Sequence, residues 1–123
     1  MQIDFEANRS MISTARRRSA RRPWLQLLSA VLELAGSKAE LLRHSERAWT
    51  SVTFSGTRHL IALSFAGNEA IEAGEDFIAA LPEHEFGISG QIVADATITA
   101  VHHEALPEER MTVEAELLLV EDA

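Results

Sequence analysis

The feature that most constrains the fold of this chain is the alternation of apolar and polar side chains between residues 86 and 120. In the first half of this segment every second residue is apolar or small: Phe86, Ile88, Gly90, Ile92, Ala94, Ala96, Ile98 and Ala100. After a loop at 105–109, the same alternation continues with Met111, Val113, Ala115, Leu117 and Leu119. A period of two places successive side chains on opposite faces of a strand. The segment therefore predicts a long antiparallel hairpin with one apolar face, and Gly87 or Gly90 is the expected position of a bulge.

Two other segments have the period of an α-helix. In the first, Pro23 suits the first helical position and Gly36 suits the end. Its apolar side chains recur at spacings of three and four: Trp24, Leu27, Leu28, Val31, Leu34 and Ala35. The second helix is expected to begin at Asn68, an N-cap residue, and to end at Pro82. Gly74 inside it weakens the helix and indicates close packing on the sheet.

Between the two helices we expect three strands, at 39–45, 47–55 and 58–65, with a tight turn at Gly56-Thr57. A further short strand is expected at 3–7, where Ile3, Phe5 and Ala7 alternate with polar residues. The fold class is therefore α+β: an antiparallel sheet of five to six strands with two helices packed on one face. The predicted element order is (β)-α-β-β-β-α-β-β, in one domain spanning residues 1–123.

Composition excludes several classes of protein. The chain has 123 residues, 46% of them hydrophobic, which is enough for one ordinary globular core. It has no cysteine, so disulfides and thiolate chemistry are absent. No apolar stretch is long enough to cross a bilayer, and the acidic opening at Asp4 and Glu6 does not resemble a signal peptide. We expect a cytoplasmic protein with no membrane association.

The charge is divided unevenly along the chain. The net charge of −8 separates into about +4 for residues 1–22 and about −12 for the rest. Residues 9–22 are therefore interpreted as an arginine-rich loop or exposed extension. This segment is a candidate anion-binding site, formed by Arg16, Arg17, Arg18, Arg21 and Arg22. Because the body is strongly acidic, we do not expect nucleic acid as a partner.

The polar residues suggest one ligand site and no catalytic one. His102-His103-Glu104 is the only local cluster of metal-ligand type, but adjacent strand residues point to opposite faces. We therefore expect no metal and no cofactor. Asp95 interrupts the long strand pattern, so Asp95, His102 and His59 are candidates to line a small-molecule pocket between helices and sheet. No nucleophile elbow or phosphate-binding loop is present.

Two segments are similar to known families. The predicted order of one helix, three strands and a second helix over residues 23–81 resembles that of double-stranded-RNA-binding domains. Those domains contact phosphates with basic side chains. The charged residues of the second helix here are all acidic: Glu69, Glu72, Glu75 and Asp76. The final hairpin, Gly90–Asp95 with Met111–Leu117, resembles the late strands of hotdog-fold acyl-thioester enzymes. That resemblance implies acyl-thioester chemistry in a pocket between helices and sheet.

The function that we predict is a non-enzymatic protein-interaction or self-associating module, whose partner is a second copy or another protein. The predicted interface is an apolar strip on the solvent face of the final hairpin, formed by Val93, Val101, Leu118 and Val120. The alternatives are small-molecule binding or hotdog-like chemistry in a pocket between helices and sheet, and anion or nucleic-acid binding through the segment from Arg16 to Arg22. The sequence leaves enzymatic activity open and favours a non-enzymatic role.

Overall fold

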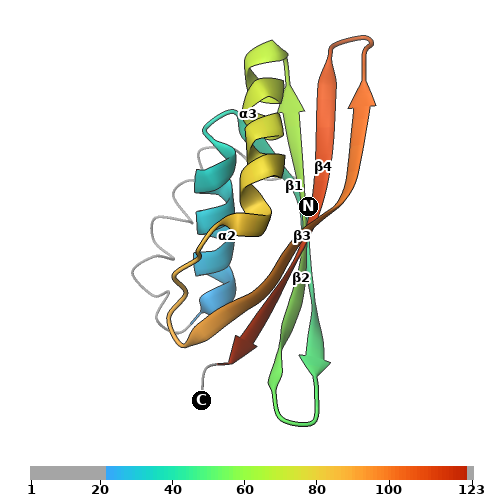
Figure 1. Ribbon diagram of the computed structural model, residues 1–123. Coiled ribbons are helices and arrows are strands. Elements are labelled where there is room, and N and C mark those ends of the chain that lie inside the picture. The colour runs from blue at the N-terminus through green and yellow to red at the C-terminus, as the bar shows by residue number, and fades with distance from the viewer. Residues whose placement is uncertain (1–21, 122–123) are drawn as a thin grey trace.

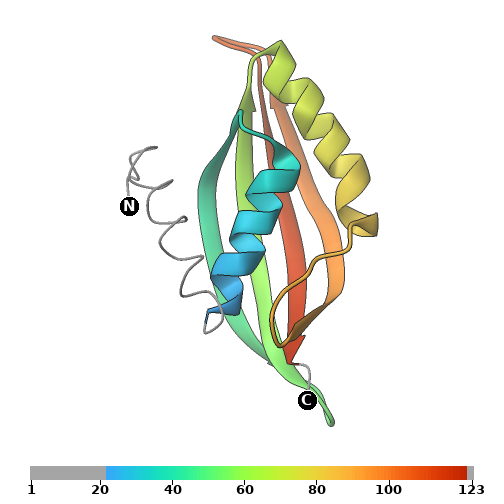
Figure 2. The ribbon, with the colours of Figure 1, turned by 90° about the vertical axis from the view of Figure 1, so that its left-hand side faces the viewer.

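The computed structural model describes residues 22–121, which form an antiparallel sheet with both helices on one face (Figures 1 and 2). The spatial strand order is β1-β2-β4-β3, so β1 and β3 are the two edges of the sheet. In chain order the elements are α2 (Pro23–Ala35), β1 (Ala39–Thr50), β2 (Ser55–Ala66), α3 (Asn68–Ala80), the 3-10 turn η2 (Leu81–Glu83), β3 (Gln91–Glu104) and β4 (Arg110–Glu121).

The described sheet has four strands, so the prediction of five to six strands is wrong. The two strands expected at 39–45 and 47–55 are one continuous strand, β1, with a register shift between Leu41 and Arg43. A bulge of this kind interrupts the alternation without ending the strand, which made one strand resemble two. The expected strand at 3–7 lies outside the described residues.

The turn between β1 and β2 lies at 51–54 and not at Gly56-Thr57. The amide of Ser51 donates to the carbonyl oxygen of Phe54 at 2.8 Å, and the amide of Phe54 donates to Ser51 Oγ at 3.0 Å. Gly56 belongs to β2, where a Cβ atom would lie 2.0 Å from the carbonyl oxygen of Leu119. The close approach of β2 to β4 therefore accounts for this glycine.

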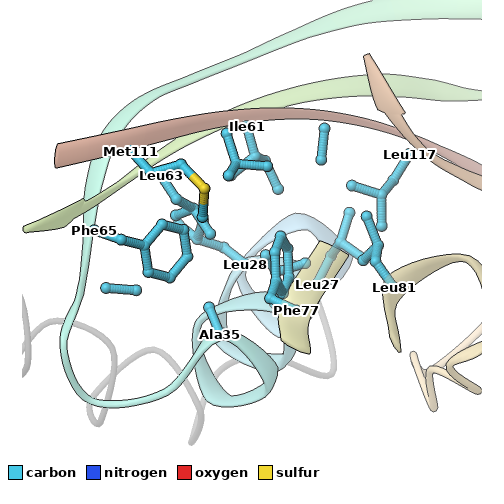
Figure 3. Close-up of a cluster of buried hydrophobic side chains, with 14 of the residues drawn as sticks. Leu27, Leu28, Ala35, Ile61, Leu63, Phe65, Phe77, Leu81, Met111 and Leu117 are labelled. Carbon is cyan, nitrogen blue, oxygen red and sulfur yellow. The ribbon is translucent and has the colours of Figure 1, made fainter. Parts of the chain in front are cut away.

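The core lies between the helices and the inner face of the sheet (Figure 3). Leu27 from α2 and Phe77 from α3 meet Phe65 of β2 and Leu117 of β4, and all four are at most 1% exposed. Both predicted helices are confirmed, although the N-cap of α3 is Gly67 and not Asn68, and α3 ends at Ala80 before the 3-10 turn that contains Pro82. Gly74 faces Phe65 and Met111 so closely that a Cβ atom would clash with both, which confirms the expected close packing of α3 on the sheet.

The long hairpin is present, but its first strand begins at Gln91 and not at the predicted residue 86. Its alternation holds throughout only in β4, where all five predicted inward residues are buried. In β3, register shifts lie between Val93 and Asp95 and between Ile98 and Ala100. Val93 packs against the core, whereas Ile92 is 52% exposed. The predicted inward orientation is therefore wrong at Ile92 and at Ala100, which pair with the outer-face residues Val120 and Glu114. Each bulge reverses the parity, and neither lies at the expected glycines.

Candidate interaction surface

The face of the sheet opposite the helices is the candidate site, and we call it the outer face. Leu117 and Leu119 of β4 point into the helix-side core, so Leu118 and Val120 between them point to the outer face. The strand register extends these two positions into rows that cross all four strands. The first row is Trp49, Gly56, Val120 and Ile92; the second is Arg47, Arg58, Leu118 and Asp95.

Apolar side chains on the outer face are partly uncovered. Leu60 is 43% exposed and Ile92 is 52% exposed. Leu118 and Val120 are only 8% and 7% exposed, because their neighbours on the same face shield them. Both helices that the structure describes lie on the opposite side (Figure 1). The outer face therefore presents apolar side chains to solvent on the central strand β2 and on the edge strand β3.

Charged side chains on the outer face are separated by sign, except for Glu40 on β1 and Arg110 on β4. The basic residues Arg43, Arg47 and Arg58 belong to β1 and β2, and the acidic residues Glu114, Glu116 and Asp95 belong to β4 and β3. Two ion pairs cross the middle of the face. Arg43 pairs with Glu114, and Arg58 Nη1 lies 3.3 Å from Glu116 Oε1.

The ion pair between Arg43 and Glu114 also explains an unusual burial. The register places Ala62 directly between these two residues, and Ala62 is only 3% exposed although it lies on the outer face. The two long side chains therefore cover Ala62, as charged side chains with apolar stems often do.

A cluster of aromatic and polar side chains lies on the inner face, where α2 meets β1 and β2. Nε2 of His44 is 2.9 Å from Nδ1 of His59, and Nε2 of His59 is 2.8 Å from Thr57 Oγ1. The indole of Trp24 stacks on His44 with ring centroids 5.5 Å apart. A carboxylate oxygen of Glu46 lies 3.9 Å from Nδ1 of His59.

The two imidazoles of this cluster favour their neutral forms. Burial lowers the pKa of His44 below its ordinary value of 6.5, and the charge of Glu46 opposes that shift. Burial also lowers the pKa of His59, and the proximity of His44 lowers it further, again against Glu46. Only one proton fits between the two facing nitrogens, so the tautomer of one ring determines that of the other.

This cluster is better suited to packing than to chemistry. His59 is 0% exposed, so no substrate reaches its ring in this conformation. Within residues 22–121 no group of three or more ligand-type side chains is arranged to hold a metal ion. Each nitrogen of His59 already faces a partner, which satisfies its hydrogen-bonding capacity.

The structure does not bring the predicted ligand residues together. His59 lies on the inner face, whereas Asp95 and His102 lie on the outer face of β3, opposite Leu118 and Thr112. The predicted interface residues are also divided between the two faces. Val93 and Val101 pair with the core residues Leu119 and Val113 and therefore point inward, while Leu118 and Val120 point outward.

Of the predicted anion-binding residues, only Arg22 belongs to the described part of the chain, where it is exposed next to the start of α2. Arg16, Arg17, Arg18 and Arg21 lie outside it.

The contribution of β1 to the outer face was missed from the sequence. Arg43, Ser45, Arg47 and Trp49 share one parity of β1, and the register places that parity on the outer face. A period-two reading that continued through residue 46 would have grouped these four residues. The bulge between Leu41 and Arg43 would still have placed them on the same face as Ala39 and Leu41, which is the wrong face.

Comparison with known proteins yields a fold likeness and no family. No protein-family model and no curated protein matches this sequence. Among solved structures, the chain is similar to a chain from the virion of a native gene transfer agent particle. The two share 14% sequence identity with a TM-score of 0.55, over 82% of this chain and 93% of that chain. At this level of identity the likeness shows the fold alone.

None of the described helices is both long and apolar enough to cross a membrane.

Proposed function

We propose that this chain is a non-enzymatic assembly subunit that associates with copies of itself through the outer face of its sheet. The observation that carries the proposal is the outer face itself. It exposes Leu60 and Ile92 and carries basic and acidic side chains on different strands, while the described helices cover only the other face. Exposed apolar side chains surrounded by polar ones are typical of protein interfaces.

The fold likeness supports a structural role. The similar chain belongs to a virion particle, and its match spans most of both chains. The alternative of a small-molecule site has less support from the geometry, because the polar residues proposed for it lie on opposite faces of the sheet. We therefore favour an assembly role, with a homodimer in the cytoplasm as its simplest form.

The proposal is tested by measuring the molar mass of the purified protein by light scattering over a range of concentrations. We expect the wild type to exceed the monomer mass of 13.6 kDa. Replacement of both Leu60 and Ile92 by Lys should shift it to the monomer, because charged side chains would then occupy the apolar contact. Leu106→Lys is the control, since Leu106 is 82% exposed in the hairpin between β3 and β4. A wild type that stays monomeric at every concentration would contradict the proposal.

A further inference from the structure

The separation of charge on the outer face specifies how a second copy would be oriented. Glu40, Arg43, Arg47 and Arg58 on β1 and β2 give this half of the outer face a net charge of about +2. Asp95, Glu114 and Glu116 on β3 and β4 give the other half about −3, and Glu104 and Arg110 face each other there and cancel. The outer face is therefore a dipolar surface whose two halves follow the strand order.

Two-fold symmetry can bring two such faces together in two ways. A two-fold axis parallel to the strands places β1 opposite β3 of the partner subunit and β2 opposite its β4. An axis across the strands places β1 opposite β1 and β3 opposite β3. The first arrangement joins unlike charges and the second joins like charges, so electrostatics favours the first.

The rows of the sheet identify the residues that would meet. Arg47 and Asp95 lie in one row, and so do Trp49 and Ile92. An axis parallel to the strands keeps each row at its own level, because it moves no point along the strand direction. Arg47 then faces Asp95 of the partner subunit, and Trp49 faces Ile92 of the partner subunit.

Within one chain Arg47 and Asp95 are too far apart to form a pair. They are separated by three strand spacings, about 14 Å. This exceeds the Debye length of about 8 Å at physiological ionic strength, so their mutual attraction is largely screened. Arg47 is exposed and makes no ion pair with any described residue, and Asp95 accepts a hydrogen bond from Thr97 Oγ1 at 3.3 Å. Both charges are thus available to a second copy.

The outer face is large enough for a stable dimer. Four strands spaced about 4.8 Å apart, with a rise of roughly 3.3 Å per residue over the paired length of β2 and β4, cover about 700 Å². Two copies would bury roughly 1,400 Å² together, which lies within the usual range of specific interfaces.

We propose that two copies pair through their outer faces about an axis parallel to the strands, so that Arg47 of each copy binds Asp95 of the other. This arrangement rests on the proposed function, since it specifies the geometry of the same self-association. Each dimer contains the Arg47–Asp95 pair twice, so reversing one charge changes two contacts.

The test is a charge exchange read out as the dimer dissociation constant by sedimentation or light scattering. Arg47→Glu and Asp95→Arg should each raise the dissociation constant at least tenfold, because each places like charges opposite one another. The double variant, R47E with D95R, should return to within a few-fold of the wild type. Glu72→Arg, an exposed change of the same size on α3, is the matched control and should leave dimerisation unchanged. Circular dichroism confirms that each variant folds.

The outcomes separate this inference from the proposed function. The orientation is wrong, while self-association stands, if the wild type is a dimer and neither single charge reversal weakens it. The same conclusion follows if the double variant does not return to the dissociation constant of the wild type. A wild-type assembly larger than two subunits overturns the arrangement if neither single reversal weakens it, since the two-fold pair would then be absent from it. A wild type that is monomeric throughout refutes both proposals.

Discussion

Replacing Gly74 by alanine tests the packing of α3 on the sheet. In an exposed helix interior this change would stabilise the protein by about 1 kcal/mol, because alanine has the better helix propensity. Here the new Cβ atom would lie 2.5 Å from Met111 Cε and 2.9 Å from two ring atoms of Phe65. Overpacking of this kind in a core costs roughly 1–3 kcal/mol. The two effects therefore oppose each other.

The neighbours of Gly74 decide which effect is larger. Met111 Cε is the end of a flexible side chain and can rotate away. The ring of Phe65 is 0% exposed and packs against Phe77 with ring centroids 6.3 Å apart, so it cannot yield without moving the helix. We therefore expect Gly74→Ala to lower the free energy of unfolding by about 1–2 kcal/mol, since the packing cost exceeds the propensity gain.

Urea denaturation followed by circular dichroism measures this difference. Ala79→Gly, on the exposed side of the same helix, is the control and should lose about 1 kcal/mol through propensity alone. If Gly74→Ala is instead more stable than the wild type, the contact between α3 and the sheet is looser than described, and the reasoning is refuted.

Two further changes test the inner cluster and the β1–β2 hairpin. Burial lowers the pKa of both His44 and His59, so the unfolded chain binds more protons than the folded one as the pH falls below about 6.5. The folded state should therefore have its full stability above that pH and should lose stability toward pH 5. In thermal denaturation, His44→Gln should reduce the loss of stability between pH 7.5 and pH 5.5, and an unchanged pH dependence would contradict this. At the hairpin tip, Val52 is fully exposed and Phe54 is 57% exposed. Replacing both by Ser should change the free energy of unfolding by less than about 0.5 kcal/mol, and a larger loss would show that they pack against something in solution.

The parts of this fold that the sequence predicted are those with uninterrupted periodicity. Both helices and the alternation of β4 contain no irregularity. The helices were identified from their periodicity together with Pro23, Gly36, Asn68 and Pro82 at their ends, and β4 from its alternation. The errors lie at the bulges. Leu42 interrupts β1, and two register shifts reverse the parity of β3. A bulge inserts one residue without a distinctive sequence signal, so a strict count of two assigns the wrong face beyond it.

The candidate site was less predictable than the fold because it depends on strand order. Leu118 was expected on the solvent side and lies on the outer face, but nothing in the sequence places Arg47 and Asp95 in one row. That row exists because β4 inserts between β2 and β3, so that the last strand lies inside the sheet. Pairing between segments distant in sequence is the information that local patterns lack.

The same insertion has a consequence for synthesis of the chain on the ribosome. The centre of the sheet joins residues 56–66 to residues 110–120, so β2 has only β1 as a hydrogen-bonded neighbour until residues 110–120 emerge. During that interval the apolar stretch from Leu60 to Phe65 presents open backbone groups along one side, a condition that favours pairing between nascent chains. Synthesis of β4 closes this gap, and a chain shortened before residue 110 would keep the open edge of β2.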